Sequence, residues 1–158
     1  MLFQKKNKAL LAVANGTAIP LEKVEDEAFS SGMLGVGVAV EPRDGTVYSP
    51  VGGQIVDISP SLHAYSIQTD DGADLLVHIG IDTVSLGGKG FLPMVSVGQT
   101  VRAGEVLARV DLNILRGGNF PRTVVVLFTD PDQLLDWRPC TGSVIGGQSK
   151  MFEYRFKE

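Results

Sequence analysis

The sequence predicts an all-β fold, an antiparallel β-sandwich or barrel of many short strands with at most one or two short helices. Three observations lead to this prediction. The 19 glycines mostly separate short apolar segments and do not interrupt long helical periodicities. Val124–Phe128 is an unbroken apolar run rich in β-branched residues, as expected for a fully buried strand. Met151–Phe156 alternates apolar and polar residues, as expected for a half-buried strand.

The first part of the chain consists of short strand patterns joined by turn signals. Asn15-Gly16 is a favoured hairpin turn, so Leu10–Ala14 and Thr17–Leu21 are expected to pair with each other. Glu22–Ser31 is acidic and irregular. Further strands are expected over Gly35–Val40, Thr46–Tyr48 and Gln54–Ile58, with turns at Asp44-Gly45, Gly52-Gly53 and Ser59-Pro60.

The second part of the chain continues this pattern. A hairpin is expected around Asp70-Asp71-Gly72, followed by a glycine-rich loop over Gly87–Gly90. Short strands are expected over Phe91–Val95 and within Val97–Leu112. Asp130-Pro131 is a helix-start signal, which predicts one short helix over Asp132–Trp137. The spacing corresponds to about ten to twelve strands in all.

Composition limits the class of protein. With 158 residues and 16.9 kDa, residues 1–158 are expected to form one domain, with residues 1–9 as a flexible N-terminal leader. A net charge of −4 argues against binding to nucleic acid. No apolar run is long enough to span a bilayer, so no stable membrane insertion is expected. The lone Cys140 fits a reducing compartment, which favours a cytoplasmic location.

Two histidines, the only ones in the chain, carry the candidate chemistry. If Asp71-Gly72 forms a two-residue type I′ turn, His63 and His78 become diagonal neighbours on one face of the hairpin. Two adjacent imidazoles suit phosphoryl transfer, because one neutral nitrogen can attack phosphorus while the other ring stabilises the charged oxygens. Ser61 lies on the same face by parity, and its hydroxyl could fix the tautomer of His63.

Other catalytic motifs are missing from the sequence. No Gly-x-Gly-x-x-Gly or P-loop pattern is present, and neither is a Gly-x-Ser-x-Gly elbow. A catalytic zinc site needs three protein ligands, and neither His-x-His nor His-Glu-x-x-His occurs. No metal or other cofactor is therefore expected. A zinc hydrolase on a related β scaffold is a disfavoured alternative.

The segment SLHAYSIQTDDGADLLVHIGIDTVSLGGKGF resembles the active-site region of the glucose-type IIA proteins of the bacterial phosphoenolpyruvate-dependent sugar phosphotransferase system. The fifteen-residue separation of His63 and His78 and the string HIGIDTV carry the resemblance. Further similar segments are ANGTAIPLEKVEDEAFSSGMLGVGVAVEP, VYSPVGGQIVDI and VSVGQTVRAGEVLARVDL, so the similarity extends over nearly the whole chain.

The resemblance implies a phosphoryl carrier. His78 would take the phosphoryl group on Nε2 from the phosphocarrier protein HPr, and His63 would stabilise the group and help to pass it to the cysteine of a IIB domain of a sugar permease. Ser61 stands where the family commonly has threonine. The implied partner-binding residues are the acidic Asp26 and Asp82 and the apolar Phe29, Leu34, Leu76 and Val84.

Departures from the family pattern concern the partners and leave the two histidines unchanged. Ser59 and Leu76 replace aromatic residues that are common around the site, and Lys89 stands where the family usually has an acidic residue. The sugar is not identified by the sequence. An alternative function stays open, in which the chain is a regulatory binding module whose phosphorylation controls target proteins such as a transporter or an enzyme.

Overall fold

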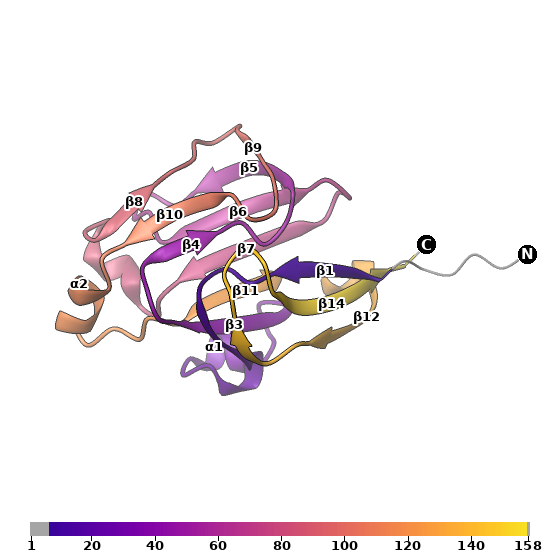
Figure 1. Cartoon of the computed structure of the whole chain (residues 1–158), viewed down its shortest axis with the longest axis horizontal. Coiled ribbons are helices and arrows are strands. Elements are labelled where there is room, and N and C mark those ends of the chain that lie inside the picture. Colours follow the sequence, from indigo (N-terminus) through magenta and orange to yellow (C-terminus); the bar gives the residue numbers. More distant parts are fainter. Residues whose placement is uncertain (1–6, 158) are drawn as a thin grey trace, which may run out of the picture.

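Antiparallel strands are the main regular elements of residues 7–157, the part of the chain that the computed structural model describes (Figure 1). The strands are β1 (Lys8–Leu11), β2 (Gly16–Pro20), β3 (Val36–Pro42), β4 (Thr46–Tyr48), β5 (Gly53–Ile58), β6 (Ala64–Thr69), β7 (Asp74–Ile79), β8 (Phe91–Pro93), β9 (Thr100–Val101), β10 (Val106–Val110), β11 (Val124–Phe128), β12 (Leu134–Pro139), β13 (Gly142–Val144) and β14 (Lys150–Phe156). The helices are α1 (Glu27–Ser30) and α2 (Leu112–Gly117), with 3₁₀ turns η1 (Leu21–Lys23), η2 (Thr83–Leu86) and η3 (Pro131–Gln133). The all-β prediction is confirmed.

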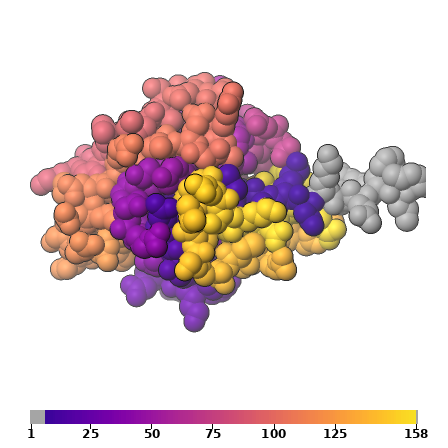
Figure 2. All heavy atoms as spheres, viewed as in Figure 1, coloured from indigo at the N-terminus to yellow at the C-terminus, as the bar shows by residue number. Residues whose placement is uncertain are grey.

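The strands of the described residues form three sheets. The largest has eight strands in the order β13-β2-β3-β11-β7-β6-β5-β9, and two three-stranded sheets have the orders β1-β14-β12 and β4-β10-β8. The N-terminal β1 and the C-terminal β14 pair and lie side by side on one face of the molecule (Figures 1 and 2). The strand β11 lies between β3 and β7, and all its residues are buried, as its unbroken apolar run predicts.

The two faces of the large sheet are covered by different groups of side chains. Alternate residues of β7 and β11, such as Val77 and Val126, belong to the main core that the three sheets share. Their neighbours in sequence, such as Leu76 and Val125, belong to a smaller cluster completed by Leu21, Val24 and Phe29 of the η1–α1 segment. Because side chains alternate along a strand, His78 projects toward this smaller cluster.

The predicted hairpin at Asn15-Gly16 is wrong. The strand β1 pairs with β14, whereas β2 pairs with β3 and β13, so the two runs belong to different sheets. Gly16 serves a close backbone approach instead, since a Cβ atom there would stand 2.0 Å from the Glu41 carbonyl oxygen. The predicted leader over residues 1–9 is wrong for Lys8 and Ala9, which belong to β1, the strand that the buried Leu10 anchors in the core. The rest of that prediction falls on residues 1–6, which lie outside the described residues, and on Asn7.

The predicted helix over Asp132–Trp137 is replaced by a 3₁₀ turn followed by β12. Pairing with β14 decides the conformation, because it buries Leu134 and aligns Arg138 with Glu153 and Asp136 with Arg155 across the strands. Tertiary contacts therefore override the local helix-start signal. None of the helices in residues 7–157 has the length and apolar character needed to cross a membrane.

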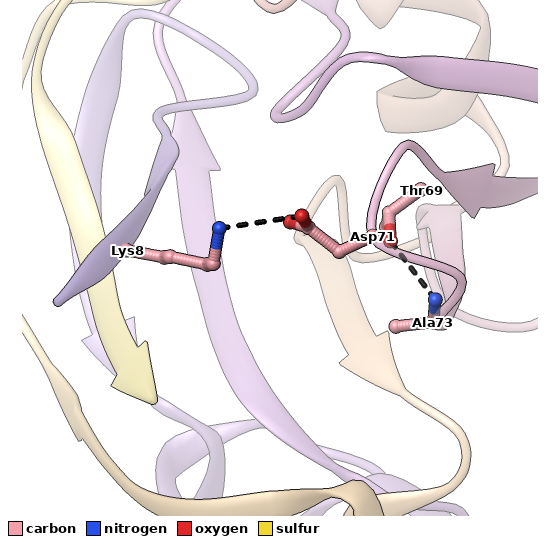
Figure 3. A network of polar contacts seen from close by, with 4 residues as sticks. All are labelled: Lys8, Thr69, Asp71 and Ala73. Atoms are coloured by element: carbon pink, nitrogen blue, oxygen red, sulfur yellow. Dashed lines mark hydrogen bonds and ion pairs between the residues drawn. The ribbon is translucent and has the colours of Figure 1, made fainter. Parts of the chain in front are cut away.

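The turn between β6 and β7 differs from the expected type. The Thr69 amide donates to the Ala73 carbonyl and the Gly72 amide donates to Thr69, with Gly72 at φ 85°, which makes a three-residue loop with a left-handed glycine. The Ala73 amide also donates to the Thr69 hydroxyl (Figure 3). An ion pair of 3.3 Å between Lys8 and Asp71 ties this turn to β1 (Figure 3). The longer loop shifts the register, so His78 faces Ala64 and not residue 65.

Candidate functional site

His78 occupies the penultimate position of β7 and is held in one orientation by the turn that follows. Its Nδ1 atom lies 2.8 Å from the carbonyl oxygen of Gly80. A carbonyl can only accept a hydrogen bond, so Nδ1 carries the proton. In the neutral ring, Nε2 therefore keeps its lone pair and is the nucleophilic nitrogen.

The Gly80 peptide is itself fixed by neighbouring segments. The amides of Gly80 and Ile81 donate to the carbonyls of Thr123 and Pro121 at 2.8 and 3.0 Å. The buried Thr83 hydroxyl donates to the Ile79 carbonyl at 2.6 Å. Gly80 has φ 76°, a left-handed conformation that glycine adopts without steric cost. The HIGID segment thus forms a rigid frame around the His78 ring.

His63 reaches the site from the residue just before β6. The preceding Leu62 has φ 63°, a left-handed conformation that is unusual for leucine and turns the chain as it enters the strand. The His63 carbonyl accepts from the Ile79 amide at 2.7 Å, which aligns the two histidine-bearing segments. His63 is 8% exposed, so most of its ring is enclosed by protein.

Ser59 makes the side-chain contact that the sequence prediction assigned to Ser61. The Ser59 hydroxyl lies 3.2 Å from Nδ1 of His63 and also accepts from the Ala64 amide. Ser61 contributes a hydrogen bond from its main chain instead, which raises the pKa of His63 against the larger effect of burial. The parity argument for Ser61 fails because residues 59–62 form a turn and are not part of β6.

The two imidazoles lie against each other in an edge-to-face arrangement. Their ring centroids are 4.9 Å apart, with 87° between the ring planes. The proximity predicted from the sequence is therefore present, although the reason given for it is wrong. With His78 opposite Ala64, strand parity alone would place His63 on the other face. The alternation of side chains does not apply to His63, because this residue lies outside the regular strand, after the left-handed Leu62.

Burial keeps both rings neutral near pH 7. Desolvation is the main cause that lowers the pKa of His78 to about 4, and the neighbouring His63 lowers it further. The Gly80 hydrogen bond and the charges of Asp26 and Asp82 oppose this shift. Burial also lowers the pKa of His63. Neutral His78 has an unprotonated ring nitrogen available for attack on an electrophile.

An aromatic ring and a short helix cover one side of His78. The Phe29 ring lies 5.0 Å from the His78 ring at an angle of 60°. It is positioned by α1, whose first turn is capped because the Asp26 carboxylate accepts from the Ala28 amide at 2.9 Å. Asp26 therefore has a structural role in addition to its charge near His78.

The other predicted partner-binding residues divide into buried and exposed groups. Leu76 is half-buried in the smaller cluster beside Phe29. Leu34 and Val84 are 44% and 57% exposed, and Asp82 is also exposed. Sequence reasoning missed Met33, which is 75% exposed next to Leu34. The run SGMLG could have indicated it, since apolar residues between glycines in a loop are often accessible.

The described residues contain no group of three or more His, Cys, Asp and Glu side chains that could hold a metal ion. The site thus offers two imidazoles and nearby carboxylates in a partly apolar setting. Such a site can carry out nucleophilic attack by one ring nitrogen, with the second ring close enough to donate a hydrogen bond to the same small group.

Comparison with known proteins gives consistent matches. Residues 8–134 match the model of a family described as phosphoenolpyruvate-dependent sugar phosphotransferase system, EIIA 1. The glucose-specific EIIA component of Mycoplasma capricolum is 47% identical over 112 residues, which cover 71% of this chain and 73% of that protein. The solved structure of glucose permease IIA from Mycoplasma capricolum has a TM-score of 0.84 at 37% identity and covers 96% of this chain and 99% of that one.

Some relatives are much longer than this chain. The glucose-specific EIICBA component of Streptococcus pneumoniae is 42% identical over 132 residues, which cover 84% of this chain but 18% of that protein. The chain thus spans about a fifth of the length of such relatives.

Proposed function

Because the chain belongs to the EIIA 1 family of the phosphoenolpyruvate-dependent sugar phosphotransferase system, we propose that it carries a phosphoryl group on Nε2 of His78. The observation that carries this proposal is the 2.8 Å contact between Nδ1 of His78 and the Gly80 carbonyl. It leaves Nε2 as the free nitrogen of a neutral ring, beside a second imidazole. We also propose that the chain forms a single IIA domain, as expected for residues 1–158, located in the cytoplasm.

The transfer is an in-line displacement between two nitrogen atoms. The Nε2 lone pair of His78 attacks phosphorus on the donor phosphohistidine, the new P–N bond forms, and the donor nitrogen recovers the electron pair of the broken bond. The proton on Nδ1 of His78 stays in place, hydrogen-bonded to Gly80. Positioning and charge stabilisation supply the catalysis.

His63 responds to the charge that arrives with the phosphoryl group. Burial lowers the pKa of His63 in the free protein. A phosphoryl group on the adjacent ring adds negative charge, which raises the pKa of His63 and favours the protonated imidazolium. The protonated ring then donates a hydrogen bond to a phosphoryl oxygen. His63 thus stabilises the transferring group in both directions.

We propose HPr as the donor and a IIB domain as the acceptor. Asp26 and Asp82 lie close enough to His78 to raise its pKa, and they provide negative charge for a basic partner surface. Exposed Leu34 and Val84 provide an apolar surface around the histidines. The EIICBA names of several relatives support a IIB partner, since they join A and B components in one protein.

A regulatory role is a second candidate, favoured by the exposed apolar residues of the same face. Met33 is 75% exposed and Val84 is 57% exposed. A partner that covers these residues would bury apolar surface in the unphosphorylated state. Phosphorylation of His78 would add charge next to that surface and weaken the complex.

Radioactive phosphoenolpyruvate, with the general phosphotransferase enzymes and HPr, tests the carrier role. We expect acid-labile, base-stable label on the wild-type protein and no label on His78→Ala. The His63→Gln protein should accept label but donate it slowly to a IIB domain. Label on His78→Ala at the wild-type level would refute the assignment. Transfer from the labelled protein to IIB domains distinguishes a carrier from a purely regulatory module, which would transfer to none.

A further inference from the structure

A charged hollow lies beside the histidine site and has no part in the proposed transfer. It has a volume of about 420 Å³, within the general range of small-molecule sites of about 300–1,000 Å³. Its lining residues come from η1 and the segment after it, the end of β3, α2 and the connection between α2 and β11. They are Lys23, Glu25, Glu41, Arg116, Asn119, Phe120, Pro121, Arg122 and Thr123.

Three of the lining side chains are cations in a chain with a net charge of −4. The ion pairs found within residues 7–157 join Lys8 to Asp71, Arg138 to Glu153 and Arg155 to Asp136, all outside the hollow. Lys23, Arg116 and Arg122 therefore have no carboxylate partner in the described part of the chain. Their positive charge is available to an anion that enters the hollow.

The two acidic residues of the hollow have a different role. The buried Thr123 donates its hydroxyl to the Glu41 carboxylate, which holds Glu41 at the wall. The second carboxylate, Glu25, completes the lining together with the half-buried Phe120. Carboxylates would repel a simple anion, but they accept hydrogen bonds from hydroxyl groups. The lining therefore suits a ligand that carries both an anionic group and hydroxyl groups.

We propose that this hollow binds a hydroxylated organophosphate of the size of a hexose phosphate. Arg116 and Arg122 contact the phosphate, since guanidinium groups bind phosphate oxygens through two parallel hydrogen bonds, and the Lys23 ammonium group adds a further positive charge. Glu25 and Glu41 accept hydrogen bonds from ligand hydroxyls, and the ring of Phe120 packs against the apolar face of the ligand.

The wall of the hollow is hydrogen-bonded to the frame of His78. The carbonyls of Pro121 and Thr123 accept from the amides of Ile81 and Gly80 at 3.0 and 2.8 Å. The Gly80 carbonyl in turn orients the His78 ring. A ligand that shifts residues 121–123 changes the geometry of Gly80 and, if the proposed carrier function holds, the rate of phosphoryl transfer through His78.

Titration with glucose 6-phosphate, followed by two-dimensional NMR of the amides, tests the proposal. We expect saturable shifts of the amides of residues 116–123 and of Gly80 and Ile81 at ligand concentrations up to about 10 mM. Arg116→Gln and Arg122→Gln should each weaken binding about tenfold, because each removes a charge-assisted contact to phosphate. Arg102→Gln removes the same charge from the exposed loop after β9 and should leave binding unchanged.

Titrations with glucose and with inorganic phosphate measure how much the sugar and the phosphate each contribute to binding. Each should bind at least about tenfold more weakly than glucose 6-phosphate if both ends are recognised. The proposal would be overturned if inorganic phosphate bound as tightly as glucose 6-phosphate, or if no saturable shift were seen. It would also be overturned if Arg102→Gln weakened binding as much as Arg116→Gln or Arg122→Gln. Labelling of His78 is measured separately on the same proteins. Absence of label on the wild-type protein, together with saturable binding of glucose 6-phosphate, would refute the carrier function and leave the binding site standing.

Discussion

The Nδ1 atom of His78 lies 2.8 Å from the carbonyl oxygen of Gly80. This contact fixes both the tautomer and the direction of the ring, because the carbonyl belongs to a residue in a left-handed conformation that hydrogen bonds to the segment before β11 hold in place. The position of the free Nε2 atom is thus determined by the backbone two residues further along the chain. Perturbing that backbone should affect stability and phosphoryl transfer together.

Gly80→Ala is expected to damage both properties. A Cβ atom at residue 80 would stand 2.4 Å from Cγ2 of the buried Thr83 and 3.1 Å from the Pro121 carbonyl oxygen, at φ 76°. We expect a loss of about 2–3 kcal/mol in the free energy of unfolding, from the left-handed conformation and the clash combined. Urea denaturation measures the stability, and rapid-quench labelling by phospho-HPr measures the transfer rate.

Gly72→Ala is the matched control for Gly80→Ala. Gly72 also has a positive φ, 85°, but a Cβ atom there would have no neighbour within 4 Å. The free energy of unfolding of Gly72→Ala should fall by only about 1–2 kcal/mol, because of the left-handed backbone conformation, and its rate of phosphoryl transfer should be that of the wild type. If the two variants behaved alike in the labelling experiment, the orienting role of the Gly80 carbonyl would be refuted.

Transfer to the protein should be almost independent of pH around neutrality. The pKa of His78 is lowered to about 4, mainly by desolvation and then by His63, so the ring is neutral at every pH well above that value. We expect a constant labelling rate between about pH 6 and 8 when the donor is saturating. Titration of the His78 ring by NMR should give a pKa well below 6.5, and the value should rise in His63→Gln, which removes the repulsion of a second imidazole. A His78 pKa near 6.5 would contradict the burial argument.

The same shift makes the folded protein less stable in acid. An unfolded His78 binds its proton near the ordinary value of 6.5, whereas the folded residue does not until about pH 4. Between these values the unfolded state holds more protons, so the free energy of unfolding falls as the pH decreases from 6.5 to 4. His78→Gln should show a smaller difference in urea midpoint between about pH 7 and 5 than the wild type. An identical difference in the two proteins would show that His78 does not contribute to the pH dependence of the stability.

The strands and the site were predictable from the sequence to different extents. Val124–Phe128 was recognised because its buried strand leaves an unbroken apolar run, which needs no partner information. The pairing of β1 with β14 could not be predicted, since it joins the two ends of the described chain and no local pattern encodes it. Asn15-Gly16 has the composition of a hairpin turn, but it serves a close approach to Glu41.

The histidine pair shows a further limit of sequence reasoning. Spacing and resemblance identified His63 and His78, but the register was off by one because the Asp70–Gly72 loop has three residues. The left-handed Leu62 restores the contact between the two rings. Leucine gives no signal for that conformation, so neither Leu62 nor the resulting contact from Ser59 could be inferred from parity.

Ser59 and Ser61 provide a direct comparison of the two assignments. The Ser59 hydroxyl lies 3.2 Å from Nδ1 of His63 and accepts from the Ala64 amide, whereas Ser61 acts on His63 through its main chain. Ser59→Ala should therefore change the NMR titration of His63 and slow the transfer from the protein to a IIB domain. Ser61→Ala keeps its main-chain contact and should leave both nearly unchanged. The reverse result would restore the role of the Ser61 hydroxyl.

Tyr65 should tolerate the loss of its hydroxyl. The side chain is fully buried in the main core, and its hydroxyl has no hydrogen-bond partner among the described residues. A buried polar group without a partner costs free energy, so Tyr65→Phe should keep or raise the free energy of unfolding, by up to about 1 kcal/mol. Tyr65→Ala is the contrasting variant, and it should lose about 3–5 kcal/mol because the ring fills the core. Urea denaturation of the three proteins measures these changes. If Tyr65→Phe instead lost more than about 1 kcal/mol, the hydroxyl would have to be hydrogen-bonded in solution, for example to a buried water molecule.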